Sequence, residues 1–91
     1  MSLEFDWDKA NRKHIARHLV STDEAEQAVN NDPLDLEMQT ESGEERLVQL
    51  GETDKHRILL VVTTWRNSKV RVITAFDAPK QLRDFYLISH S

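Results

Sequence analysis

The chain has 91 residues, no cysteine and a formal net charge of −4, and 31% of its residues are charged. This length fits one domain with a single thin core, which we expect to span residues 1–91. The lack of cysteine excludes disulfides, thiol chemistry and cysteine-based zinc sites. The longest apolar run, Ile58 to Val62, is too short to span a bilayer, and the first residues are acidic and lack the apolar stretch of a signal peptide. We therefore expect a cytoplasmic protein.

The charge is divided unevenly along the chain. Residues 1–45 hold four Lys or Arg against twelve Asp or Glu, whereas residues 46–91 hold eight against four. The two halves therefore carry formal charges of −8 and +4. This indicates a polarised molecule if the halves stay apart in space. Overall acidity counts against a general nucleic-acid binder, because phosphate contacts dominate that affinity, but it leaves room for a local basic cleft.

The first elements are a short edge strand and a helix. Phe5 to Trp7 alternates apolar and polar residues, and Asp8 then suits a helix N-cap. The run Lys9–Leu19 contains no Gly or Pro and predicts a helix, with Ile15 and Leu19 one turn apart on its core side.

A second, shorter helix follows. Ser21 and Glu24 have the spacing of a capping box, and Pro33 marks the far limit of the helix because proline disfavours helix in the residue before it. Its narrow apolar stripe consists of Ala25, Ala28 and Val29.

Strands dominate the second half of the chain. They are expected at Leu34–Gln39, Arg46–Leu50, Arg57–Trp65 and Val70–Ala75, joined by turns. Arg57–Trp65 is apolar on both faces and should be the internal strand. Asp77 can cap a last helix with Pro79 in its first turn and an apolar stripe of Leu82, Phe85 and Tyr86. The order predicts an α+β fold with a small antiparallel sheet of three to four strands, two N-terminal helices and one C-terminal helix.

Two histidines, His14 and His18, lie four residues apart on the first helix. They could line a cleft as a pair, or sit on the helix shoulder where imidazole packs against an edge and touches solvent. Their spacing is that of a metalloprotease helix, but Ile15 stands where that motif requires a glutamate. We therefore expect no metal and no cofactor.

Four arginines lie on or beside neighbouring strands: Arg46, Arg57, Arg66 and Arg71. Guanidinium groups that share a sheet face can bind a phosphate and stabilise a pentacoordinate transition state. Alternatively, each arginine pairs with a carboxylate from the acidic half. Trp65 ends the internal strand, where it could stack on a base or close the edge of the core.

Several segments, in order, resemble the family of BrnT-like toxins. Trp7-Asp8, Asn11 and the run from His14 to Ser21 are similar to the family opening W-D-x-x-N-x-x-H-I-A-R-H-G-V-[ST]. Later matches are Asp23–Glu26, Asn31–Pro33, Glu45–Leu47, Leu60–Val62, Arg71–Ala75 and Arg83–Tyr86. Two positions depart from the pattern: Leu19 stands where the family has glycine, and Phe76 stands where it usually has arginine.

The resemblance implies a RelE-like fold and a bacterial type II toxin that cleaves RNA without metal or cofactor. It also implies a small DNA-binding antitoxin that covers the active face, so that DNA is contacted only through the antitoxin. Carried over by position, the catalytic candidates are His14, His18, Arg46 and Arg71. We further expect RNA contacts from Arg57, Trp65 and Arg66. The alternatives are a catalytically inactive relative that binds an antitoxin, which Phe76 and the acidity favour, and a stand-alone structural domain.

Overall fold

The structure, a computed structural model, describes residues 3–90. Within that range the elements are α1 (Lys9–Ala16), α2 (Thr22–Asn30), β1 (Leu34–Glu41), β2 (Glu44–Glu52), β3 (Ile58–Arg66), β4 (Lys69–Asp77) and α3 (Lys80–Ser89). The four strands form one antiparallel sheet in the order β1-β2-β3-β4, and the apolar β3 is internal as predicted. The expected α+β fold, with two N-terminal helices and one C-terminal helix, is confirmed.

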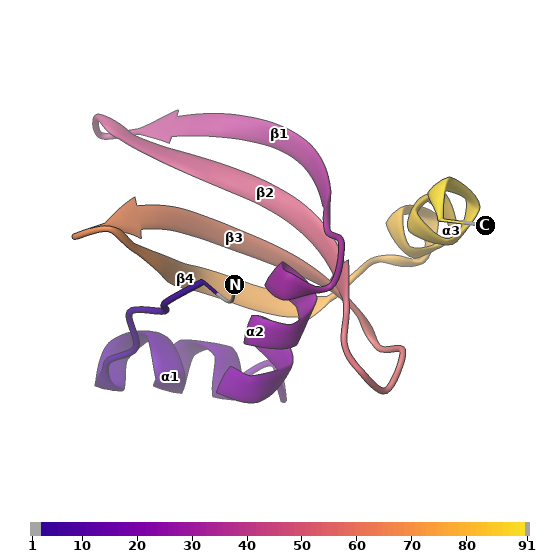
Figure 1. The fold of residues 1–91 in the computed structure, drawn as a ribbon, viewed down its shortest axis with the longest axis horizontal. Coiled ribbons are helices and arrows are strands. Elements are labelled where there is room, and N and C mark those ends of the chain that lie inside the picture. Colours follow the sequence, from indigo (N-terminus) through magenta and orange to yellow (C-terminus); the bar gives the residue numbers. More distant parts are fainter. Residues whose placement is uncertain (1–2, 91) are drawn as a thin grey trace.

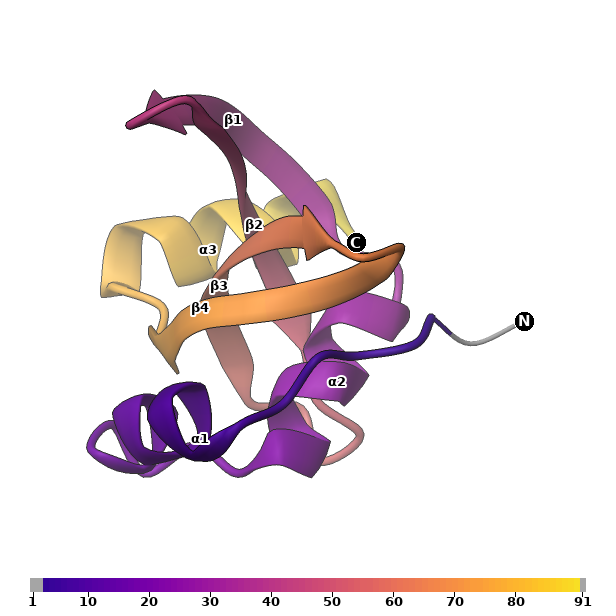
Figure 2. The same cartoon turned by 90° about the vertical axis from the view of Figure 1, so that its left-hand side faces the viewer.

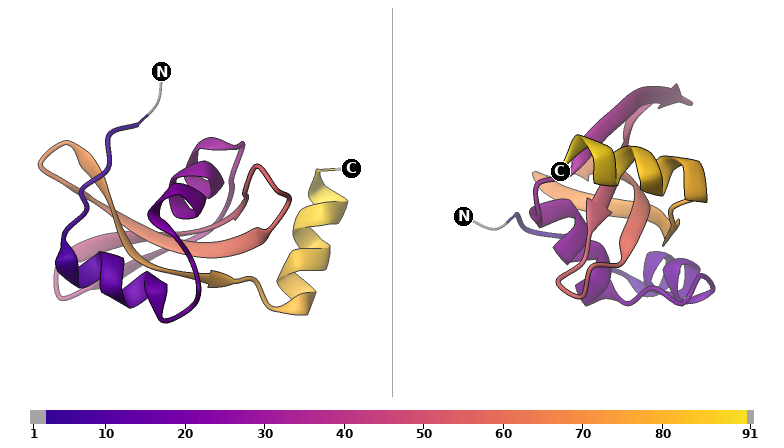
Figure 3. Two further views of the ribbon diagram at one scale, coloured as in Figure 1. Left: turned by 90° about the horizontal axis from the view of Figure 1, so that it is seen from below. Right: turned by 90° about the vertical axis from the view of Figure 1, so that its right-hand side faces the viewer.

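The two faces of the sheet are covered differently. Figure 1 shows α1 and α2 together below the sheet and α3 apart from them at its right-hand end. The core under α1 and α2 is made of Ile15, Val20, Ala25, Ala28, Val29, Leu59, Val61, Val72 and Ala75. On the other face, Tyr86 of α3 packs with Leu50 and Ile58. Figure 3 shows that α3 covers only the end of the sheet where β2 leaves and β3 begins.

Close packing of α2 on the sheet depends on Gly51. This residue pairs with Leu59 on the face that α2 covers. A Cβ at Gly51 would lie 2.1 Å from the carbonyl oxygen of Ala28, well inside van der Waals contact. The missing side chain therefore lets the backbones of β2 and α2 approach each other.

The start of α1 was predicted correctly, and its end was not. Asp8 is the N-cap and forms a reciprocal capping box with Asn11. The helix stops at Ala16 rather than Leu19, with backbone bonds from Leu19 N to Ala16 O and from Val20 N to Ile15 O. These bonds are those of a Schellman motif, which requires a left-handed residue, and Leu19 has φ 58°. Leu19 is consequently 82% exposed instead of lying in the core.

The second helix matches its prediction more closely. Ser21 and Glu24 form the expected capping box, and the helix ends at Asn30 before the Asp32-Pro33 break. The predicted apolar stripe Ala25, Ala28 and Val29 is buried.

The chain ends differ from their predictions in two places. The segment Phe5–Trp7 is reduced to one parallel bridge between Phe5 and Val70, and Figure 2 shows this segment passing beside β4. Asp77 does not cap α3. It is the last residue of β4 and is paired with Arg57, so Pro79 takes the N-cap position without a side-chain bond.

The apolar stripe predicted for α3 is confirmed only in part. Tyr86 is buried and Leu82 packs against the same cluster, but Phe85 is 49% exposed. The helix rests on the end of the sheet and therefore buries a narrower stripe than a helix lying across the sheet would.

The turns of the β1–β2 and β3–β4 hairpins lie at the end of the sheet opposite α3 (Figure 1). The turn after β1 has positive φ at Ser42 and Gly43, and the turn after β3 has positive φ at Asn67 and Ser68. Two consecutive left-handed residues are typical of type I′ turns, whose twist matches that of the strands they join. In residues 3–90, no helix is long and apolar enough to cross a membrane.

Candidate functional site

Three of the four candidate arginines share one face of the sheet. Directly opposed residues of an antiparallel pair point to the same side, and Thr64 is opposed to Arg71 while Arg66 is opposed to Lys69. Arg46 belongs to the same face because it alternates with Val48 and Leu50, and Leu50 is opposed to Leu60 there. This is the face that α3 covers at its other end.

These arginines meet His14 in a cavity of about 360 Å³ near the hairpin turns. Its lining consists of Ala10, Asn11, His14, Glu44, Arg46, Thr64, Arg66, Arg71, Val72 and Ile73. The residues come from α1 and from three strands, β2, β3 and β4. The lining residues include three guanidinium groups and one carboxylate, so the lining itself is net positive although the chain as a whole is acidic.

Arg71 is held in place by the start of α1. Its Nη1 lies 2.9 Å from Asp8 Oδ2 and 3.6 Å from Asp6 Oδ2, and its side chain is 16% exposed. Apart from these two ion pairs, this buried nitrogen has no hydrogen-bond partner in the part of the chain that the structure describes. The pKa of Asp8 is lowered, first by the backbone N–H of Asn11 and then by Arg71.

Asn11 connects the start of α1 to β4 and is almost fully buried. Its Nδ2 donates to the carbonyl oxygens of Asp6, at 3.0 Å, and Val72, at 3.1 Å. Trp7 adds a hydrogen bond from its indole nitrogen to Glu26 of α2, at 2.7 Å. The segment Trp7-Asp8-x-x-Asn11 therefore fixes α1 against β4 and, through Asp8, orients Arg71.

Arg46 and Arg66 differ in what binds them. Arg46 forms ion pairs of 2.9 Å with Glu41 and with Glu44, and all three side chains are at least 28% exposed. Ion pairs at such exposure contribute only about 0–1 kcal/mol, so an incoming phosphate can displace them. Arg66 is exposed and forms no ion pair with any residue between 3 and 90.

The two histidines lie next to each other, but only His14 lines this cavity. Their ring centroids are 5.6 Å apart, His14 is partly buried and His18 is exposed. His14 lines the cavity, and its Nε2 lies 3.0 Å from the hydroxyl oxygen of Thr74 on β4. Either partner of that bond can donate, depending on the tautomer of the ring. His18 has its second ring neighbour in Phe76, also at 5.6 Å.

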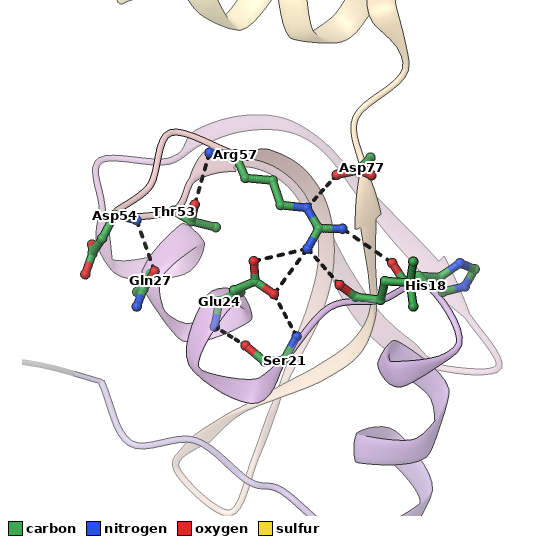
Figure 4. A network of polar contacts seen from close by, with 9 residues as sticks. His18, Ser21, Glu24, Gln27, Thr53, Asp54, Arg57 and Asp77 are labelled. Atoms are coloured by element: carbon green, nitrogen blue, oxygen red, sulfur yellow. Dashed lines mark hydrogen bonds and ion pairs between the residues drawn. The ribbon is translucent and has the colours of Figure 1, made fainter.

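Arg57 and Trp65 are not part of this cavity. Figure 4 shows the guanidinium of Arg57 between the turn after α1, α2 and the end of β4, where it binds Glu24 and Asp77. Trp65 lies on the opposite sheet face, in a separate groove of about 600 Å³ that includes Met38 and Leu47. It is 66% exposed, so the prediction that it closes the core edge is wrong.

The alternative that arginines of the second half pair with carboxylates of the first half is confirmed for three of them. Arg46 pairs with Glu41 and Glu44, Arg57 with Glu24, and Arg71 with Asp6 and Asp8. The two halves of the chain therefore interleave, and the separation of charge that the sequence indicated is largely cancelled at these contacts.

Sequence reasoning missed the roles of two threonines and the ion pair that Asp8 forms in addition to its predicted cap. Thr74 binds His14, Thr64 lines the cavity while donating to the Glu45 carbonyl, and Asp8 serves as both N-cap and ion-pair partner. Only a correct strand register would have found Thr64, because it is opposed to Arg71. In residues 3–90, no group of three or more His, Asp or Glu side chains is placed to hold a metal ion.

A comparison with protein families gives a match over most of the chain. The model of a family described as "Ribonuclease toxin, BrnT, of type II toxin-antitoxin system" matches residues 7–81. The chain belongs to the BrnT toxin family. No curated protein matches the chain. The matched BrnT region contains the whole lining of the cavity and both histidines, and it ends just after α3 begins.

The two departures from the BrnT pattern fall beside the same histidine. Leu19 directly follows His18 in the chain, and the Phe76 ring lies against the His18 ring. Phe76 is opposed to Leu60, which places it on the sheet face of Arg71. An apolar ring thus stands where the pattern that the sequence resembles usually has arginine.

Proposed function

We propose that this BrnT protein is a metal-independent ribonuclease toxin whose cavity binds the scissile phosphate of RNA. One observation supports this most: three guanidinium groups and His14 converge on a single open cavity at the hairpin end of the sheet. Guanidinium matches the geometry of phosphate oxygens and keeps its charge at every physiological pH. Arg66 and Arg46 would make the first contacts, and the less exposed Arg71 would hold the phosphate in one orientation.

The histidines would move the protons. In the proposed reaction the RNA 2′-oxygen attacks the adjacent phosphorus as one imidazole takes the 2′ proton. The bond from phosphorus to the 5′ oxygen then breaks, and the second imidazole supplies the proton that this oxygen needs. Histidine is the side chain whose charge ordinarily changes between pH 5 and 8, which suits both transfers. The arginines would offset the negative charge of the pentacoordinate intermediate.

Phe76 should make this enzyme slow. It offers no donor and no charge beside His18, where the family pattern places arginine. Removing one preorganised donor from an oxyanion site costs about 10²–10³-fold in rate, and a missing guanidinium should have a similar effect. We therefore expect weak cleavage from the chain as it stands.

The proposed partner is a small DNA-binding antitoxin, as expected for a type II system, acting with the toxin in the cytoplasm. The antitoxin would cover the cavity, and contact with DNA would come through it alone. A second candidate function is a catalytically inactive relative that only binds this antitoxin. Two observations favour it: Phe76 stands against His18, and both Arg46 and Arg71 already carry carboxylate partners.

Cleavage of RNA in the presence of EDTA tests the proposal. The proteins compared are wild type, Phe76→Arg, Arg66→Met in the cavity and Arg83→Met on α3 as the matched exposed control. We expect Phe76→Arg to be at least about tenfold faster than wild type, which is ~1.4 kcal/mol of transition-state stabilisation. Arg66→Met should be slower, and Arg83→Met should equal wild type. If no protein cleaves RNA, while all of them bind the antitoxin equally, the binding-module function is the correct one.

A further inference from the structure

The polar network around Arg57 connects three elements that are distant in sequence. Figure 4 shows this side chain, from the start of the internal strand, reaching the turn after α1, the first turn of α2 and the end of β4. We propose that Arg57 is a positioning residue that sets the place of His18 by holding the C-terminal turn of α1. The consequence for RNA cleavage rests on the proposed function, whereas the clamp itself does not.

Arg57 binds two carbonyl groups of the turn that follows α1. Its Nη1 donates to the carbonyl oxygen of Leu19 at 2.7 Å, and its Nη2 donates to that of His18 at 3.4 Å. Carbonyls in a turn have no partner in a helix or sheet and need donors from elsewhere. A guanidinium that reaches two successive carbonyls fixes the direction in which the chain leaves α1.

Carboxylates hold the other side of the same guanidinium. Nε donates to Asp77 at 2.6 Å, and Nη1 lies 3.1 Å from both carboxylate oxygens of Glu24. The pKa of Asp77 is lowered chiefly by Arg57, and that of Glu24 is lowered first by the Ser21 backbone N–H and then by Arg57. Asp77 directly follows Phe76, so the clamp joins the turn that carries His18 to the strand that carries its ring neighbour.

All three nitrogens of Arg57 are thereby engaged within the protein. A guanidinium has five N–H donors, and those of Arg57 already bind two carbonyls and two carboxylates. Arg57 also lies outside the lining of the cavity that holds the other arginines. These contacts argue for a structural connection rather than for the RNA contact that the sequence predicted.

His18 depends on this connection more than His14 does. His14 lies within α1, and Thr74 binds its ring. His18 follows the helix, is exposed, and has ring contacts only with His14 and Phe76 among the described residues, both at 5.6 Å. The next residue, Leu19, has the left-handed backbone that an L side chain disfavours. The position of His18 is therefore set by the backbone that Arg57 holds.

The test compares Arg57→Met, Arg57→Lys and the exposed control Arg83→Met in protein labelled with ¹⁵N-histidine. Ring signals are assigned with His14→Gln, His18→Gln and His90→Gln. We expect the His18 ring signals of Arg57→Met to shift and broaden while those of His90 stay unchanged. Arg57→Lys should recover only part of the wild-type spectrum, because an ammonium cannot bind both carbonyls and both carboxylates at once. Unchanged His18 signals in folded Arg57→Met would overturn the proposal.

Kinetics separates positioning from RNA binding. In Arg57→Met the rate at saturating RNA should fall at least about tenfold, since a misplacement of ~1 Å can cost about 10²-fold, while the half-saturating RNA concentration stays within about twofold. Arg66→Met should instead raise that concentration. A rise for Arg57→Met equal to that of Arg66→Met would show that Arg57 contacts RNA and would also overturn the proposal.

A replacement variant and the His18 spectra cover two cases: Arg57→Met does not fold, or wild type does not cleave RNA. If Arg57→Met does not fold, Asp77→Asn replaces it, because this change removes one anchor of the clamp and should move the His18 signals in the same direction. Unmoved His18 signals in folded Asp77→Asn would reject the clamp. If wild type does not cleave RNA, the proposed function fails, and the His18 spectra alone decide whether Arg57 sets the position of this ring.

Discussion

Replacement of Leu19 by glycine should stabilise this protein, although it removes a large apolar side chain. Leu19 occupies the left-handed position of the Schellman motif that ends α1, with φ 58°. This backbone costs an L residue about 1–2 kcal/mol, whereas glycine adopts it without strain. The BrnT pattern that the sequence resembles has glycine at this position.

The size of the gain follows from three contributions. Relief of strain raises the free energy of unfolding by about 1–2 kcal/mol. The greater freedom of glycine in the unfolded chain lowers it by about 0.5–1 kcal/mol. Leu19 is 82% exposed, so less than a fifth of its apolar surface is buried. Full burial of a leucine is worth about 1.5–3 kcal/mol, and the remaining loss is therefore about 0.3–0.5 kcal/mol. The net gain for Leu19→Gly is about 0.2–0.5 kcal/mol, or an increase in Tm of about 1–4 °C for a chain of this size.

The decisive comparison is between Leu19→Gly and Leu19→Ala. Both variants lose the leucine side chain, but only glycine relieves the backbone. Urea and thermal unfolding followed by circular dichroism should place Leu19→Gly about 0.5–1 kcal/mol above Leu19→Ala in free energy of unfolding. If alanine were as stable as glycine, the left-handed conformation at Leu19, and with it the account of how α1 ends, would be wrong.

Further predictions concern packing and pH. Gly51→Ala should lower the free energy of unfolding by about 1–3 kcal/mol, because its Cβ would meet the Ala28 carbonyl oxygen at 2.1 Å. Gly43→Ala is the control, since its Cβ meets nothing within 4 Å and only its φ of 81° resists the change; equal losses for the two would refute the packing argument. Acid should weaken the fold through the Arg57 clamp. The pKa values of Glu24 and Asp77 are lowered in the folded state, so their stabilisation is present above their unfolded pKa values and is lost as the pH falls through the folded ones. Below about pH 5 the stability of wild type should therefore fall more steeply than that of Arg57→Met, and parallel urea-midpoint curves would contradict this.

Elements set by local interactions could be predicted from the sequence. Asp8 and Ser21 cap helices through bonds to residues three positions away, so spacing alone reveals them. The strands also follow from alternation, and the internal place of β3 follows from its two apolar faces. In the same way, the positions of four arginines on or beside neighbouring strands predicted that some of them would share a face. Three of them do, and Arg57 does not.

Features that depend on long-range partners could not be predicted. Asp77 has the spacing of an N-cap, but Arg57, twenty residues earlier in the chain, binds its carboxylate.

Leu19 continues the apolar spacing of Ile15, but the helix ends before reaching it. Periodicity describes a face only while an element continues, and it does not say where the element stops. The glycine in the family pattern was the one sequence signal that pointed to the true end of α1.

The chemistry proposed for the cavity is tested most directly by the ends of the RNA fragments. A defined RNA is incubated with wild type and with Phe76→Arg in EDTA, and the products are weighed by mass spectrometry. Attack by the 2′-oxygen predicts 2′,3′-cyclic phosphate ends together with 5′-hydroxyl ends, in larger amounts from Phe76→Arg. Fragments with 5′-phosphate and 3′-hydroxyl ends, or cleavage that occurs only when a divalent metal is added, would contradict the account.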